Sequence, residues 1–249
     1  MKAMLIDITK CIGCEACVYA CKDQNKLPEE VDPKLTDKTW TVLEEHKDLF
    51  VRKLCMHCKD PACASVCPVG AFRKTEEGAV VYDGHKCIGC RYCMVACPFS
   101  IPKYEWDKAL PLVQKCIFCF DRISKGEQPT CAEVCPTEAT LFGDRDDLLR
   151  EAKMRIRQNP DLYVDHIFGA EEVGGTCVLY LSSVPFKDIG FRTDLTPEPL
   201  PRITWKVMSL VPNVMSLAGV GLLGTWWIIN RRIKLDRERA EQVEEAEAE

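Results

Sequence analysis

The cysteines of this chain fall into four groups of four, and this spacing limits more than any other feature what the chain can fold into. The groups begin at Cys11, Cys55, Cys87 and Cys116, so their starts are 44, 32 and 29 residues apart. The total of 17 cysteines is odd, so a closed set of disulfides cannot include them all. A small repeated unit that binds metal is the better interpretation.

Each quartet resembles the cysteine run that holds 4Fe-4S clusters in bacterial ferredoxins. Two quartets have the full Cys-x2-Cys-x2-Cys-x3-Cys spacing, and the other two lengthen its middle gap. The full runs are Cys11, Cys14, Cys17, Cys21 and Cys87, Cys90, Cys93, Cys97; the lengthened runs are Cys55, Cys58, Cys63, Cys67 and Cys116, Cys119, Cys131, Cys135. These sixteen cysteines predict four 4Fe-4S clusters, with the cysteines as the iron ligands.

The pairing of the quartets is inferred from the length of chain that two of them span together. In a two-cluster ferredoxin the fourth cysteine of each run crosses to the other cluster. The second and third quartets span only residues 55–97, the size of such a ferredoxin, so we pair them, and the first and fourth pair by elimination. The predicted ligand sets are Cys11, Cys14, Cys17 and Cys135 (cluster a); Cys116, Cys119, Cys131 and Cys21 (cluster b); Cys55, Cys58, Cys63 and Cys97 (cluster c); and Cys87, Cys90, Cys93 and Cys67 (cluster d). Sequential pairing, first with second and third with fourth, uses the same residues and changes only the crossing ligands.

Zinc is the main alternative metal, in a structural or interaction protein with a membrane anchor. Zinc ribbons also use Cys-x2-Cys pairs, but they do not normally add a third cysteine at the same spacing followed by Cys-x3-Cys-Pro. Cys177 lies outside the quartets in an apolar segment, and we expect a buried thiol there. His57, inside the second quartet, either packs within its loop or donates a hydrogen bond to a cluster sulfur.

The regions around the quartets predict an α+β fold, with two nested bacterial-ferredoxin-like modules and a C-terminal single transmembrane helix. Residues 71–83 predict a β-hairpin, and residues 4–9 and 176–182 predict strands. A helix is predicted over 146–158, with Asp144 as its N-cap. We divide the chain into a four-cluster region (1–143, with the outer module from 11–21 and 116–135 and the inner module 55–97), an extension with a proline-rich linker (144–205), the transmembrane helix (206–231) and a charged tail (232–249).

The apolar segment 207–230 contains 24 residues without a charge, which is long enough to cross a bilayer core of roughly 30 Å as a helix. Trp205 and the Trp226-Trp227 pair lie where interfacial aromatics belong. Basic residues number three before the segment and five after it, which favours a cytoplasmic C-terminus and a periplasmic cluster region at the inner membrane. We expect no export signal of the chain's own, because the first cysteine group begins at Cys11. The same protein with its clusters facing the cytoplasm is the alternative.

Composition and motifs exclude several functions. The net charge of −5 and the absence of a basic block with interleaved aromatics argue against nucleic-acid binding. No nucleophile-base motif, phosphate loop or dinucleotide fingerprint is present, so we expect no catalytic residues and a chain that is not an enzyme by itself. Four clusters within about 125 residues predict a relay for single electrons.

The cysteine-rich runs resemble a known family. They read CMHCKDPACASVCP over 55–68, CIGCRYCMVACPF over 87–99 and KCIFCFDR over 115–122. These runs are similar to those of the four-cluster iron-sulfur (beta) subunits of membrane oxidoreductases, which include formate dehydrogenases, nickel-iron hydrogenases and dimethyl sulfoxide reductase. The resemblance covers residues 1 to about 143, and the segment 172–181 followed by one C-terminal helix resembles the formate dehydrogenase and hydrogenase types most.

This resemblance implies partners and an electron path. It implies the nested pairing of quartets, a catalytic molybdenum, tungsten or nickel-iron subunit on one side, and a multi-helix membrane subunit that reacts with quinone on the other. It also implies export as a folded complex on the catalytic partner's twin-arginine signal. The expected lack of a signal favours the formate dehydrogenase type, whereas the segment LSSVPFKDIG (181–190) favours the hydrogenase type. The electron donor therefore stays open between the two.

Overall fold

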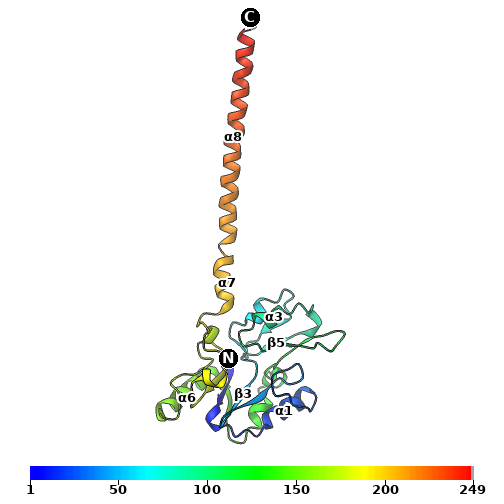
Figure 1. Cartoon of the computed structure of the whole chain (residues 1–249), viewed down its shortest axis with the longest axis vertical. Coiled ribbons are helices and arrows are strands. Elements are labelled where there is room, and N and C mark those ends of the chain that lie inside the picture. Colours follow the sequence, from blue (N-terminus) through cyan, green and yellow to red (C-terminus); the bar gives the residue numbers. More distant parts are fainter. Residues whose placement is uncertain (248–249) are drawn as a thin grey trace. The chain divides into compact units, whose positions relative to one another are not determined.

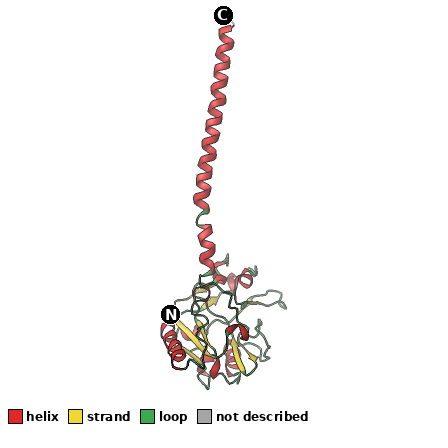
Figure 2. Ribbon diagram, turned by 60° about the vertical axis from the view of Figure 1, so that its left-hand side comes forward, coloured by secondary structure: helices red, strands yellow, loops and turns green. Residues whose placement is uncertain are grey.

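The computed structural model describes residues 1–247, which divide into two compact units, Met1–Pro201 and Arg202–Glu249. The first unit is built around a small sheet with loops and short helices on it (Figures 1 and 2). The second is helical. The division places every cysteine in the first unit.

The N-terminal strand is the middle strand of the central sheet. Strand β1 (Lys2–Asp7) pairs antiparallel with β8 (Thr140–Asp144) and parallel with β9 (Val178–Leu181). Residues 3–6 are fully buried because both faces of β1 are covered, which is why this strand reads as a continuous apolar run. The predicted strands over 4–9 and 176–182 are confirmed, but the first is shifted to Lys2–Asp7 and the second is shortened to Val178–Leu181.

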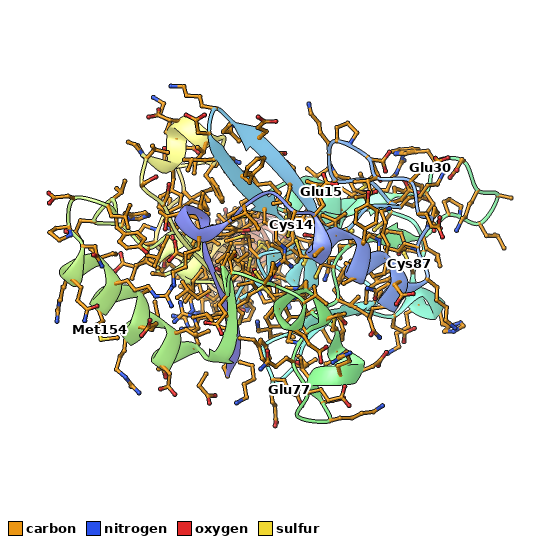
Figure 3. All side chains as sticks on the ribbon, turned by 90° about the horizontal axis from the view of Figure 1, so that it is seen from below. Cys14, Glu15, Glu30, Glu77, Cys87 and Met154 are labelled. Atoms are coloured by element: carbon orange, nitrogen blue, oxygen red, sulfur yellow. The ribbon has the colours of Figure 1, made fainter. Side chains whose placement is uncertain are left out.

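Helix α6 (Arg145–Gln158) follows β8 directly and packs against β1 and β8. Leu148, Ala152 and Ile156 recur at helical spacing and are buried, while Met154 is exposed on the outer side of the helix (Figure 3). The helix begins where the sequence predicts. Asp144 is the N-cap residue, as predicted, but its side chain makes no capping hydrogen bond. It accepts a hydrogen bond from Lys2 Nζ at 3.1 Å instead.

Three hairpins support the cysteine loops: β2 (Val42–His46) with β3 (Leu49–Lys53), β4 (Phe72–Lys74) with β5 (Val80–Tyr82), and β6 (Lys103–Tyr104) with β7 (Val113–Gln114). The β4-β5 pair confirms the hairpin predicted over 71–83. Its turn lies against the central sheet, where the Lys2 backbone N–H donates to the Glu77 carbonyl at 2.9 Å.

The cysteine region contains five short helices: α1 (Ala16–Asn25), α2 (Ala62–Ser65), α3 (Tyr92–Ala96), α4 (Phe120–Ile123) and α5 (Thr130–Glu133). All except α4 carry the third cysteine of a quartet. Before the first and third quartets, the side chains of Asp7 and Asp83 cap the 3-10 turns η1 (Ile8–Lys10) and η2 (Gly84–Lys86). The sequence repeat is therefore also a repeat of local structure.

An aromatic cluster closes the core beyond β9. It is formed by Phe168, Tyr180, Phe186 and Phe191, with the Phe168 and Phe191 ring centroids 4.7 Å apart. Two further 3-10 turns, η3 (Glu172–Gly174) and η4 (Phe186–Ile189), carry the chain around it. This segment follows the cysteine region in sequence, and its aromatic side chains belong to the same hydrophobic core as Cys55, Cys116 and Cys131.

The C-terminal unit consists of α8 (Val211–Glu247), preceded by α7 (Leu200–Met208). The helix expected over 206–231 is thus divided at Ser209-Leu210, because Pro212 lacks the N–H that a continuous helix needs there. The uncharged part of α8, Val211–Asn230, still spans about 30 Å. Its apolar side chains are exposed, so this one candidate membrane span fits a single-pass anchor.

Candidate iron-sulfur sites

The first two cysteines of every quartet enclose the same tight turn. The residue before the second cysteine has a positive φ in all four loops: Gly13 (72°), His57 (47°), Gly89 (70°) and Phe118 (64°). This turn directs backbone N–H groups at the first sulfur, as the Gly89 N–H donates to Cys87 Sγ at 3.4 Å and the Phe118 N–H to Cys116 Sγ at 3.4 Å. Such concave arrays of amides favour anionic ligands.

The short helices pack in a nested order. Helix α1 of the first quartet packs against α5 of the fourth, and α2 of the second packs against α3 of the third. The fourth cysteine of one quartet is consequently close to the first three of another. Cys135 acts electrostatically on Cys11 and Cys17, and Cys97 acts on Cys58.

Burial and mutual repulsion raise the pKa of most of these thiols. Burial, followed by the nearby Cys131 and Cys119, raises the pKa of Cys21 to about 12. Burial and the neighbouring Cys55 raise the pKa of Cys63 to about 12. Converging buried thiolates need positive charge between them, and the iron of a 4Fe-4S cluster supplies it. All seventeen cysteines lie in the described residues and none forms a disulfide.

Two fourth cysteines differ from the others. Burial alone raises the pKa of Cys67, but backbone N–H groups of the turn that follows, led by Ala71, outweigh burial and lower it. The Ala71 N–H lies 3.2 Å from Cys67 Sγ. Cys135 has the same arrangement, with amides led by that of Thr140 lowering its pKa against burial. Both cysteines precede a proline. Cys97 also does, but there burial outweighs the backbone N–H groups of the following turn, led by Ile101, and the pKa of Cys97 is raised.

Two buried cations lie among the cysteines, and the sequence analysis did not identify either of them. Arg52 on β3 is 2% exposed and donates to the hydroxyls of Thr41 and Thr140 at 3.1 Å each. Burial lowers the pKa of Arg52, but the nearby Cys131 and Cys17 outweigh burial and raise it. Lys115 is 4% exposed and donates to the Val80 and Cys116 carbonyls. Lys115 directly precedes the first cysteine of the fourth quartet, which was an available signal, whereas Arg52 had no such signal in its local sequence.

His57 is completely buried, with its ring stacked on Phe118 at a centroid distance of 4.5 Å. The Val80 backbone N–H donates to His57 Nδ1 at 2.9 Å. Burial, followed by the positive charges of Lys115 and Lys74, holds the pKa of His57 well below its usual value, so the ring is neutral. The sequence expectation of packing within the loop is therefore incomplete, because the ring contacts the loop of another quartet.

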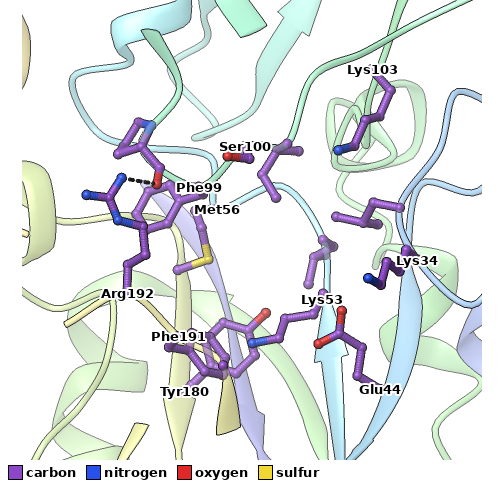
Figure 4. Close-up of a pocket in the computed structure, with 15 residues that line it drawn as sticks. Lys34, Glu44, Lys53, Met56, Phe99, Ser100, Lys103, Tyr180, Phe191 and Arg192 are labelled. Carbon is purple, nitrogen blue, oxygen red and sulfur yellow. Dashed lines mark hydrogen bonds between the residues drawn. The ribbon is translucent and has the colours of Figure 1, made fainter. Parts of the chain in front are cut away.

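A basic cavity opens beside Cys55 and Cys97 (Figure 4). Arg192 donates to the Pro98 carbonyl at 3.2 Å, and Lys53 Nζ lies 3.2 Å from the centroid of the Phe191 ring. Burial lowers the pKa of Lys53 to about 8. Lys34 and Lys103 also line the cavity, together with one carboxylate, that of Glu44, so positive charge exceeds negative charge there.

Cys177 is buried, as expected, but its thiol is not in apolar surroundings alone. Lys74 Nζ lies 3.2 Å from Cys177 Sγ, and the Sγ lies 3.3 Å from the sulfur of Met1. The Cys177 backbone N–H donates to the carbonyls of Met56 and His57, in the loop of the second quartet, at 3.2 Å each. Among residues 1–247, no three His, Cys, Asp or Glu side chains converge closely enough for a single metal ion.

The comparisons with known proteins identify the type of cluster. Residues 10–71 and residues 46–145 each match the 4Fe-4S dicluster domain. A protein of Nitratidesulfovibrio vulgaris is 43% identical over 98% of this chain and 71% of its own length. The hydrogenase-2 operon protein HybA of Escherichia coli is 37% identical over 75% of this chain and 71% of its own length.

A third relative links the chain to another enzyme class. The iron-sulfur subunit of the nitrate-inducible formate dehydrogenase of Escherichia coli is 38% identical over 72% of this chain and 67% of its own length. The fold and the cysteine groups thus define an electron-transfer protein with four 4Fe-4S clusters. The chain belongs to the family of iron-sulfur electron-transfer subunits of formate dehydrogenase- and hydrogenase-type complexes.

Proposed function

We propose that the four clusters are held by the nested ligand sets, a to d, derived from the sequence. The packing of α1 on α5 and of α2 on α3 supports this pairing over the sequential one. The electrostatic neighbours agree: Cys21 is influenced by Cys131 and Cys119, as expected if it is the fourth ligand of cluster b. Bound clusters accept and release single electrons.

The contacts between the sets support the linear order a, b, c, d. Sets a and b meet where Cys131 acts on Cys17. Sets b and c meet where Cys55 acts on Cys116, and sets c and d meet where Cys93 acts on Cys63. The proposed relay therefore has two middle clusters and two end clusters.

Exposure distinguishes the ends of the relay from its middle, and this observation carries the proposal. Cys14 of set a and Cys90 of set d are the two exposed cysteines, whereas all four cysteines of set b are buried. Figure 3 shows Cys14 and Cys87, from the two end sets, at separate places on the first unit. Electrons enter near one end cluster and leave near the other, and the chain itself performs no bond chemistry.

The relatives and the C-terminal helix suggest what lies at the two ends. We infer a catalytic subunit with molybdenum or tungsten, as in formate dehydrogenases, or with nickel and iron, as in hydrogenases. At the other end we place a multi-helix membrane subunit that reacts with quinone. The basic residues after the apolar segment support a cytoplasmic C-terminus and a periplasmic cluster region.

The first experiment is anaerobic purification of the complex from membranes in mild detergent. Partner subunits are identified by mass spectrometry, and iron, sulfide, molybdenum, tungsten, nickel and zinc are counted. We expect four clusters' worth of iron and sulfide in this chain and one of the named catalytic metals in its partner. Zinc without sulfide would contradict the relay. Protease access to the residues after Asn230, in sealed cells and in inverted vesicles, tests the orientation.

Replacement of one end ligand tests the relay itself. In the Cys90→Ser variant we expect loss or conversion of cluster d and a large decrease in quinone reduction, because an end cluster is missing. Cys177→Ser is the matched control, since Cys177 is also a free cysteine but lies outside the four sets. It should keep all four clusters. Unchanged quinone turnover in Cys90→Ser would show that electrons do not pass through cluster d.

A further inference from the structure

The residue before the second cysteine of each quartet differs between the loops in an informative way. All four have a left-handed backbone, which glycine adopts easily and other residues rarely do. The first and third quartets have Gly13 and Gly89 there, but the second and fourth have His57 and Phe118. Side chains occupy these two positions against the preference of the backbone, which points to a role for them.

His57 and Phe118 lie where the inner and outer modules meet. Their rings stack at 4.5 Å with an interplanar angle of 29°, and they are 0% and 1% exposed. Cys116 and Cys55, from the same two loops, are close enough to influence each other. The stacked pair therefore lies at the junction of the proposed clusters b and c.

The hydrogen bonds of His57 determine which ring nitrogen carries the proton. Nδ1 accepts from the Val80 N–H at 2.9 Å, so Nδ1 is unprotonated. The neutral ring then has its proton on Nε2. Within the described residues, this Nε2 is the one fully buried side-chain nitrogen or oxygen without a hydrogen-bond partner. A buried donor without a partner is unfavourable, and it points to an acceptor that binds there.

We propose that His57 Nε2–H donates a hydrogen bond to a sulfur of one of the two middle clusters, at the junction of b and c. The proposal rests on the ligand sets given above. A hydrogen bond to sulfur stabilises the reduced, more negative cluster and raises its reduction potential. His57 thus tunes the relay, because its hydrogen bond makes one middle cluster easier to reduce than the same cluster without this bond.

The test is an EPR-monitored redox titration of the purified, four-cluster complex. His57→Phe keeps an aromatic ring for the stack on Phe118 but has no donor, whereas His57→Gln retains an N–H donor at a similar reach. His85→Phe is the matched control, because His85 also lies in a cluster loop region, two residues before Cys87, but is exposed. We expect one midpoint potential to fall in His57→Phe, to recover in His57→Gln and to stay unchanged in His85→Phe.

Two results would overturn the inference. One is four unchanged potentials in a His57→Phe complex with full iron content, and the other is an equal fall in His57→Phe and His57→Gln. If the variants lose their clusters, pulsed EPR of the unmodified complex with 15N-labelled histidine decides. Coupling of one histidine nitrogen to a reduced cluster supports the hydrogen bond, and its absence refutes it. The relay itself would fail differently, through missing clusters in the unmodified complex.

Discussion

Replacing Gly78 by alanine should loosen the contact between the β4-β5 hairpin and the central strand β1. Gly78 has a φ of +104°, and an added Cβ would lie 2.5 Å from the Lys2 carbonyl oxygen and 3.0 Å from Met1 Cγ. Lys2 pairs with Asp144 of β8, and this pairing holds its carbonyl in place. The added methyl must instead displace the hairpin turn.

The magnitude has two parts. A residue with a Cβ in left-handed backbone costs about 1–2 kcal/mol, and overpacking against a fixed neighbour costs about 1–3 kcal/mol. Gly78→Ala should therefore lower the free energy of unfolding by about 2–5 kcal/mol. Gly70→Ala is the matched control, because Gly70 has a φ of +61° but no heavy atom within 4 Å of the added Cβ. Only the backbone part applies to it.

The assay is thermal unfolding at one scan rate, followed by far-UV circular dichroism and by the visible absorption of the clusters. A domain of this size shifts by about 2–4 °C per kcal/mol, so the midpoint of Gly78→Ala should lie about 2–12 °C below that of Gly70→Ala. Equal midpoints for the two variants would refute the reasoning, because they would show that the hairpin does not need its close approach to β1.

Two further predictions concern buried charges. Arg52→Met should lower the free energy of unfolding, measured in urea, by about 3–5 kcal/mol and lower the reduction potentials of clusters a and b, because a buried cation between their thiolates is lost. The control Arg150→Met, at an exposed arginine, should change neither the stability nor the potentials. Unchanged potentials of clusters a and b in Arg52→Met would contradict the role of Arg52. Burial raises the pKa of Glu105, but hydrogen bonds from Lys108 and the Leu112 N–H outweigh burial and lower it below 4.5. Its stabilisation should be complete above about pH 4.5 and be lost as the pH falls through the lowered pKa. The free energies of unfolding of wild type and Glu105→Gln, measured in urea from pH 7 downward, should become more similar as the pH falls below about 4.5. A difference that stays constant with pH would contradict the stabilising role of the Glu105 carboxylate.

Cysteine spacing was enough to predict the clusters, because the ligand types and their separations are local properties of each loop. The hairpin over 71–83 and helix α6 were also predictable, since their signals lie within about fifteen residues. Pro212 could have indicated the division between α7 and α8, because a proline within an apolar run interrupts the helical hydrogen bonds.

Long-range contacts were not accessible in this way. Arg52 on β3 lies among cysteines from residues 17 to 131, and nothing near Arg52 in sequence indicates that it is buried. The same holds for His57, whose loop was identified correctly while its stack on Phe118, 61 residues away, depends on the folding of the whole unit. Asp144 stands at the predicted helix start, but its side chain bonds Lys2, a partner from the other end of the region.

The position of β1 in the middle of the central sheet has a consequence for biosynthesis. Strand β1 is synthesised long before its two neighbours in the sheet, and the second of these, β9, begins only at Val178. At about 5–20 residues per second, that interval is roughly 10–30 s. The apolar strand and the first cysteine loop must stay soluble and reduced during this time. The strand order therefore predicts that this chain depends on a chaperone or on assembly factors early in its synthesis, before any cluster is enclosed.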